Sequence, residues 1–300
     1  MKTRNWGLGI LALGAIVAVT AAATGPLPGL VPDTSAYGSD QSPVIPAENA
    51  KPGIVAEVLG LLQEPKAVFD ARTKVTTECM AAAGFPGFSN GGQGDRLTDM
   101  SASLRGFPGL SLERARMNGY RSEDDAVTSP AADPAEELKA YQGFDPIKSG
   151  ADPDFTKGCR GAGYIAIYGG ATADQEFTRV LGTLLPAIHS ANRDIGFKNA
   201  LVEWSKCMSD AGFPALTDPG NAASLSLNFV GADGTDGAGP EARRIAVADV
   251  TCRGTTNLIP RLDAVLARYL TTAVEKHGQE FAPARALRKE SAARVAALTK

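Results

Sequence analysis

One eight-residue element occurs twice in this 300-residue chain, and both copies begin with a cysteine. Residues 79–86 read Cys-Met-Ala-Ala-Ala-Gly-Phe-Pro and residues 207–214 read Cys-Met-Ser-Asp-Ala-Gly-Phe-Pro, so six of the eight positions match. The other two cysteines share a second motif, because residues 159–161 and residues 252–254 both read Cys-Arg-Gly. All four cysteines therefore belong to two copies of one scheme.

Each repeated segment has the features of a helix that stops abruptly. In the second copy, Trp204, Cys207 and Met208 recur at helical spacing and so share one face. Gly212 follows that face, and glycine at the end of a helix commonly adopts the left-handed conformation that terminates it. A second helix then carries Cys252. We therefore predict, in each copy, an antiparallel pair of helices bridged by a disulfide.

The cysteine pairing is predicted from the repeat alone. Four cysteines allow three pairings, and one bridge within each copy gives Cys79–Cys159 and Cys207–Cys252. The chain has no Cys-x-x-Cys, the spacing typical of redox pairs and of many zinc sites. We favour structural disulfides, each stabilising the fold by roughly 2–5 kcal/mol in an oxidising compartment, over free thiols, a redox pair or a metal site.

The same motifs carry a resemblance to known proteins. The Cys-Met-x-x-x-Gly-Phe helix ends, together with the Ala-Asp-x-x-Cys segment at residues 248–252, resemble uncharacterised exported proteins of high-GC Gram-positive bacteria. The resemblance covers most of the chain after residue 60. It implies an extracytoplasmic location and a helical fold, and it implies no activity. Related proteins often carry a lipoprotein cysteine, which this sequence lacks.

The first 23 residues have the pattern of a secretory signal peptide. Lys2 and Arg4 form a basic start, and residues 6–23 are uncharged and end in three alanines, as signal peptidase requires. An uncleaved anchor is the alternative, since about 18 apolar residues just span a bilayer. Residues 24–53 are rich in Pro and Gly and predict an extended linker. Either way, we expect the rest of the chain outside the cytoplasm, secreted or membrane-anchored by this segment.

The body of the chain is predicted to be mainly α, a disulfide-stapled helical domain built from two related helical-hairpin copies with long polar loops. Aromatic residues make up only 6% of the sequence and Gly is abundant, which favours helices packed through small side chains. We place the first copy with its long loop at residues 54–170 and the second at residues 171–282. Residues 283–300 are expected to form a charged helix or tail. Loops are expected at residues 85–109 and 213–239.

No catalytic or metal-binding motif in the sequence is complete. Residues 87–91 match Gly-x-Ser-x-Gly but lack the preceding strand and following helix of a nucleophile elbow, so we favour a loop. Residues 233–237 resemble part of a calcium loop without its closing glutamate, so we favour a solvated turn. His189 and His277 have no cysteine or acid at ligand spacing and are interpreted as helix-end histidines. No metal or cofactor is predicted.

Two further patterns have alternative readings. Asp249 and Arg253 are spaced for a local ion pair worth a few tenths of a kcal/mol, although a buried polar role beside Cys252 is the alternative. A second pattern is an apolar stripe that we interpret as core, with a partner-helix surface as the alternative. The stripe consists of Leu258, Leu262, Val265, Leu266, Tyr269 and Leu270.

Function is constrained more by exclusion than by a motif. The net charge of −3 gives no basic field for a phosphate backbone, so nucleic acid is not an expected partner. We expect a non-enzymatic envelope or secreted protein, an interaction or accessory module for an envelope protein or cell-wall component. Membrane contact is expected only through an uncleaved N-terminal segment. The alternative is an extracytoplasmic hydrolase with an acidic site on the loops at 85–130 and 213–239.

Overall fold

The structure is a computed structural model, and every regular element in its described part is a helix. The chain divides into two units, residues 1–38 and residues 39–300, and the described residues all belong to the second. Among them, no helix is long and apolar enough to cross a membrane. The predicted signal segment lies outside the described residues. The structure describes residues 45–88, 101–121, 134–143, 156–171, 173–229 and 238–298.

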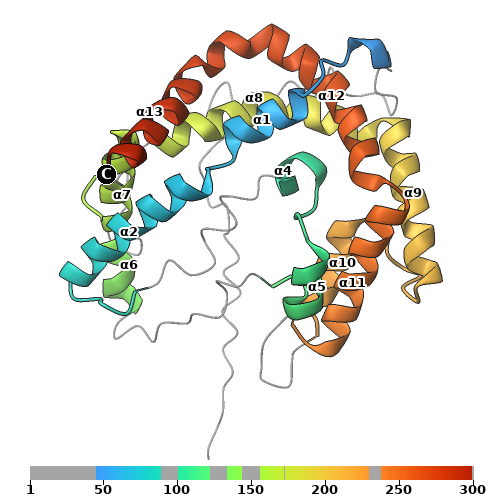
Figure 1. Cartoon of the computed structure of the whole chain (residues 1–300), viewed down its shortest axis with the longest axis horizontal. Coiled ribbons are helices and arrows are strands. Elements are labelled where there is room, and N and C mark those ends of the chain that lie inside the picture. Colours follow the sequence, from blue (N-terminus) through green and yellow to red (C-terminus); the bar gives the residue numbers. More distant parts are fainter. Residues whose placement is uncertain are drawn as a thin grey trace, which may run out of the picture. The chain divides into compact units, whose positions relative to one another are not determined.

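The mainly helical fold confirms the predicted fold class (Figure 1). The longer helices are α1 (Ile54–Leu62), α2 (Lys66–Ala82), α6 (Pro134–Gln142), α7 (Cys159–Tyr168), α8 (Ala173–Arg193), α9 (Ile195–Asp210), α11 (Pro240–Thr255), α12 (Leu258–His277) and α13 (Ala282–Leu298). The shorter elements are α4 (Ser101–Arg105), α5 (Leu112–Asn118), α10 (Pro219–Ser226), and the 3-10 turns η2 (Ala47–Asn49) and η4 (Gly278–Phe281).

Two of the short helices, α4 and α10, occupy segments that we predicted as loops. In α10, the side chain of Asp218 accepts a hydrogen bond from the backbone N–H of Asn221 at 2.9 Å. Pro219 occupies the first helical position, where its missing N–H costs nothing. This start signal outweighs the polar composition on which the loop prediction was based.

The two repeated segments terminate their helices in the same way. Gly84 and Gly212 adopt left-handed φ angles of 98° and 94°. The phenylalanine after each glycine donates its backbone N–H to the carbonyl of Met80 at 2.9 Å or of Met208 at 2.8 Å. These bonds satisfy carbonyl groups that the end of a helix would otherwise leave without partners. The predicted glycine stop is confirmed at both positions.

Both disulfides have the pairing that the sequence favoured, Cys79–Cys159 and Cys207–Cys252. The first joins the end of α2 to the start of α7, which is the geometry expected of an antiparallel pair. The second joins the last turns of α9 and α11, so these helices meet at the same ends. The predicted antiparallel hairpin is therefore wrong for this pair. The reason is that Cys159 begins its helix, whereas Cys252 follows three turns of helix that start at Pro240.

The core is organised around α12, which packs against α1, α8, α9 and α11 (Figure 1). All six residues of its apolar stripe are at most 5% exposed. The core interpretation of the stripe is confirmed, because these side chains pack within the chain itself. Ahead of α1, Arg268 donates to the carbonyl of Ile45 at 2.9 Å, and the N–H of Lys51 donates to Thr271 at 2.8 Å. Thus the last part of the expected linker, residues 45–53, is attached to α12.

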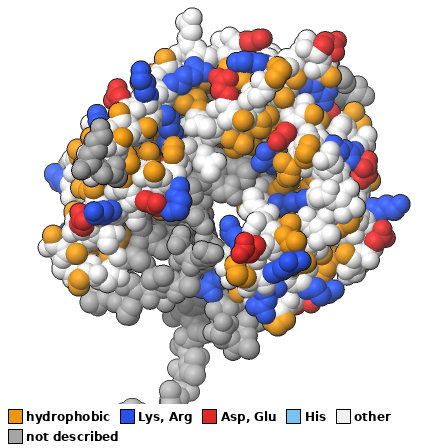
Figure 2. Space-filling view, viewed as in Figure 1, with side chains coloured by type: hydrophobic (Ala, Val, Ile, Leu, Met, Phe, Trp, Pro, Cys, Tyr) orange, Lys and Arg blue, Asp and Glu red, His pale blue; other side chains and the backbone are white. Residues whose placement is uncertain are grey.

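The charged side chains are mixed on the face shown in Figure 2, where Lys and Arg lie among Asp and Glu. Several charged residues form exposed pairs within a single helix, such as Lys66–Asp70 in α2 and Glu241–Arg244 in α11. Exposed pairs of this kind contribute little to stability because solvent screens them. The charges that matter to the fold are therefore the buried ones described below.

Gly163 marks a close approach between α7 and α2. A Cβ atom at this position would lie 2.4 Å from the hydroxyl of Thr76 and 3.1 Å from the carbonyl of Arg72. We therefore expect Gly163→Ala to lower the free energy of unfolding by about 1–3 kcal/mol, the usual cost of overpacking. Urea titration followed by circular dichroism measures the change.

A matched control is Gly60→Ala in α1, where an added Cβ meets nothing within 4 Å. There the substitution removes only the conformational freedom of glycine, so we expect a gain of about 0.5–1 kcal/mol. If Gly163→Ala raised the free energy of unfolding, as Gly60→Ala is expected to do, the close contact between α2 and α7 would be refuted.

Candidate functional site

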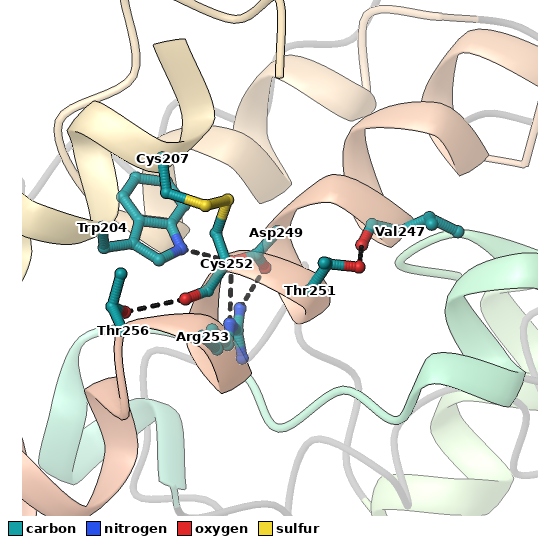
Figure 3. The surroundings of a disulfide bond; sticks show 8 residues. All are labelled: Trp204, Cys207, Val247, Asp249, Thr251, Cys252, Arg253 and Thr256. Carbon is teal, nitrogen blue, oxygen red and sulfur yellow. Dashed lines mark hydrogen bonds and ion pairs between the residues drawn. A yellow bond between two sulfur atoms is a disulfide. The ribbon is translucent and has the colours of Figure 1, made fainter. Parts of the chain in front are cut away.

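A buried carboxylate, Asp249, lies beside the Cys207–Cys252 disulfide (Figure 3). It is fully buried and accepts from Trp204 Nε1 at 3.0 Å and from Arg253 Nε at 2.8 Å, both at Oδ1. Its other oxygen accepts from Arg253 Nη2 and from the hydroxyl of Tyr120 at 2.6 Å. The predicted ion pair and the buried polar role are therefore both confirmed. The value of a few tenths of a kcal/mol applies to exposed pairs, so it is not carried over to this buried one.

The groups around Asp249 connect three parts of the chain. Arg253 also donates to the carbonyl of Pro108 at 2.8 Å, and its guanidinium lies 4.6 Å from the ring centre of Phe107. Burial raises the pKa of Tyr120, and the charge of Asp249 raises it further, so the tyrosine stays protonated and donates. Donors from α9, from α11 and from the segment after α5 occupy both oxygens of Asp249. The carboxylate therefore holds these three parts of the chain together.

A second buried carboxylate, Glu64, follows the end of α1 and is 8% exposed. It accepts from Arg72 at 3.0 Å through Nε and at 2.7 Å through Nη2, the bidentate geometry that favours such pairs. The hydroxyl of Tyr168 donates to the same carboxylate at 2.7 Å. The cluster thus joins α1, α2 and α7. Sequence reasoning missed it, because no local pattern links residues 104 positions apart.

Arg288, on α13, extends this cluster. Its Nη1 donates to the hydroxyl of Tyr168 at 2.7 Å, and its Nε and Nη2 donate to the carbonyls of Leu61 and Leu62 at 2.9 Å and 2.7 Å. Its guanidinium lies 3.8 Å from the ring centre of Phe177. Burial lowers the pKa of Arg288, against opposing effects of Tyr168 and Glu64. Arginine nevertheless remains charged in proteins, so this is a cation held at the C-terminal end of α1.

A pocket of about 200 Å³ opens beside Arg288, between α7, α8, α13 and the end of α1. One face of α8 lines it through Asp174, Phe177, Thr178 and Leu181, which recur at helical spacing. The opposite side carries Tyr164 and Tyr168 from α7, whose rings stack at 5.8 Å. Leu62 and Glu64 complete the lining. The pocket therefore combines an apolar wall with a small number of charged groups, as small-molecule sites do.

A larger hollow of about 420 Å³ lies near the end of α11 and differs in its charges. It is lined by two arginines, Arg105 and Arg253, and both already have a carboxylate partner. Arg105 holds Asp263 at 2.8 Å, and Arg253 holds Asp249. Because both arginines already have a carboxylate partner, the described lining of this hollow offers an anionic ligand no unpaired cation, whereas the pocket beside Arg288 does offer one.

The other residues considered from the sequence are not brought together. His189 is exposed on α8, and His277 ends α12. The Nδ1 of His277 lies 2.8 Å from Glu280, so the expectation that no acid is placed near this histidine is wrong. In the part of the chain that the structure describes, no three His, Cys, Asp or Glu side chains are grouped to hold a metal ion. Most of the Gly-x-Ser-x-Gly segment, the Asp-Gly segment at 233–237 and most acidic loop residues lie outside the described ranges.

Comparisons of the chain with models of known protein families, with curated proteins and with solved structures gave no match. No residue role is therefore transferred from another protein. The function is therefore inferred from the sequence and the structure of this chain.

Proposed function

We propose that this chain is an exported binding module, an interaction or accessory protein of the cell envelope. The observation that carries the proposal is the pair of disulfides, Cys79–Cys159 and Cys207–Cys252. Disulfides persist in oxidising compartments and are rare in the cytosol, so they indicate an extracytoplasmic environment. The uncharged segment at residues 6–23 would direct export, whether it is cleaved or kept as an anchor. The resemblance to exported proteins of high-GC Gram-positive bacteria supports the same location.

The buried charges support a binding role over catalysis by these groups. Three carboxylates are buried in the described part of the chain, Glu64, Asp249 and Asp194, and burial most readily adapts such groups to acid–base work. Asp194 accepts from the hydroxyl of Tyr269 at 2.9 Å and lies 3.4 Å from Arg268. Each of the three is instead held by an arginine and at least one further donor, which fixes neighbouring helices. The two disulfides and these buried clusters hold the helices together, and a body that is ordered before it binds lowers the entropy cost of binding a partner. We propose an envelope protein or a cell-wall component as that partner.

The export proposal predicts a difference in thiol labelling between two forms of the chain. In whole cells, we expect the full chain to be recovered outside the cytoplasm, with all four cysteines resistant to a maleimide reagent until a reductant is added. A form that lacks residues 6–23 is the control, and it should stay in the cytosol with reactive thiols. Recovery of the full chain in the cytosol with free thiols would refute export.

The binding role is tested separately by crosslinking in the same cells. We expect discrete crosslinked adducts of the full chain with envelope material, and no such adducts for the control form. Hydrolytic activity on envelope polymers with no adducts would instead support the hydrolase alternative.

A further inference from the structure

We infer that the pocket beside Arg288 binds an amphipathic carboxylate, that is, a hydrocarbon or aromatic chain that ends in a single carboxylate group. This inference deepens the proposed binding role and rests on it, since it names a ligand class for one site of the module. Three observations support it: the pairing of the charged side chains, the donors that remain on Arg288, and the apolar wall.

The charged side chains that line the pocket differ in whether they have an ion-pair partner. Two carboxylates line it, and each has its own arginine: Glu64 pairs with Arg72 at 2.7 Å, and Asp174 pairs with Arg160. Arg288 also lines the pocket, and within the described ranges no carboxylate forms an ion pair with it. Among the charged side chains that line the pocket, Arg288 is therefore the one without an ion-pair partner in the described part of the chain. A cation in a partly desolvated site favours a ligand that supplies the missing anion.

The hydrogen bonds of Arg288 leave room for that anion. A guanidinium carries five N–H donors, and three of those of Arg288 are used, by the hydroxyl of Tyr168 and by two carbonyls at the end of α1. One N–H on each terminal nitrogen has no acceptor in the described part of the chain. A carboxylate accepts from such a pair of nitrogens through charge-assisted bonds. It would also offset the burial that lowers the pKa of Arg288.

The walls of the pocket suit a hydrocarbon tail. Tyr164, Phe177, Leu181 and Leu62 supply aromatic and aliphatic surface next to the charged groups. The pocket measures about 200 Å³, whereas a protein cavity of about 150 Å³ is enough to bind benzene. It therefore accommodates a ring or a short alkyl segment, and the rest of a longer chain can leave past the exposed Thr178.

Isothermal titration calorimetry on the disulfide-intact protein tests the inference. The probes are decanoate, decanol and decyltrimethylammonium, each below its aggregation concentration, so that the tail is constant and only the head group changes. We expect decanoate to bind at least tenfold more tightly than either of the others. Equal affinity for the three probes, tighter binding of the cationic probe, or no binding of decanoate would overturn the inference.

Two variants locate the site. Thr178→Trp places a large side chain at the pocket mouth and should weaken decanoate binding at least tenfold. Thr183→Trp is the matched control, because both threonines lie on α8 and donate to the carbonyl four residues earlier, but only Thr178 lines the pocket. Arg288→Gln should abolish the preference for decanoate over decanol, provided that circular dichroism shows an intact helical fold.

Unchanged binding in Thr178→Trp, or equal losses in both tryptophan variants, would place the site elsewhere and refute the assignment. Failure of this inference is distinguishable from failure of the proposed function. Thiol labelling and crosslinking in cells report on export and partner binding, whether or not the pocket takes a carboxylate.

Discussion

Asp249→Ala is expected to lower the free energy of unfolding by about 3–5 kcal/mol, the cost of leaving one partner of a buried ion pair uncompensated. Arg253 is only 7% exposed and would lose its carboxylate while keeping a single bond to the carbonyl of Pro108. Trp204 and Tyr120 would each lose the acceptor for a buried donor. Urea unfolding of the disulfide-intact protein, followed by circular dichroism, measures the effect.

The matched control is Glu241→Ala, because Glu241 also pairs with an arginine, Arg244, on the same helix at 2.7 Å. That pair is exposed, so its loss should leave the unfolding curve close to that of the unmodified protein. Similar shifts for Asp249→Ala and Glu241→Ala would contradict the view that Asp249 ties the helices together.

Removal of either disulfide should have an effect of comparable size. The two bridges close stretches with sequence separations of 80 and 45 residues. The chain-entropy relation then gives about 4.5 kcal/mol for Cys79–Cys159 and about 4 kcal/mol for Cys207–Cys252. Each bridge is removed by replacing both of its cysteines with serine, so that no free thiol remains to exchange.

Adding a reductant to the unmodified protein opens the disulfides without changing the sequence. Comparing its effect with that of the serine variants separates the loss of a bridge from the effect of the substitutions. We expect a reductant to lower the free energy of unfolding of the unmodified protein by more than the removal of either bridge by substitution does, because the reductant opens both bridges. A chain in which all four cysteines are serine should not respond to the reductant. If the unmodified protein kept its stability after reduction, the bridges would not be the clamps that the account requires.

The features that the sequence predicted well have causes that lie within a few residues of one another. The glycine stops after Met80 and Met208 depend on one left-handed residue and one backbone bond, so both were predicted from the repeated motif. The disulfide pairing followed from the same repeat. The apolar stripe of α12 was visible because helical periodicity marks a buried face.

The features that the sequence did not predict depend on contacts between distant helices. Glu64 follows the end of α1, Tyr168 lies in α7 and Arg288 lies in α13. Each of them looks like an ordinary residue of its own segment. The pocket was missed for the same reason. The relative direction of α9 and α11 was also mispredicted, since the Cys-Arg-Gly motif does not say whether it begins a helix or ends one.

The most direct test of the central claim is a peptide mass map, made without reduction, of the protein recovered from the cells that produce it. The map reads the mature N-terminus and the cysteine pairing in one measurement. The account predicts a protein found outside the cytoplasm, with Cys79 linked to Cys159 and Cys207 linked to Cys252. Free thiols, or a bridge that joins Cys79 or Cys159 to Cys207 or Cys252, would contradict a body clamped by these two disulfides.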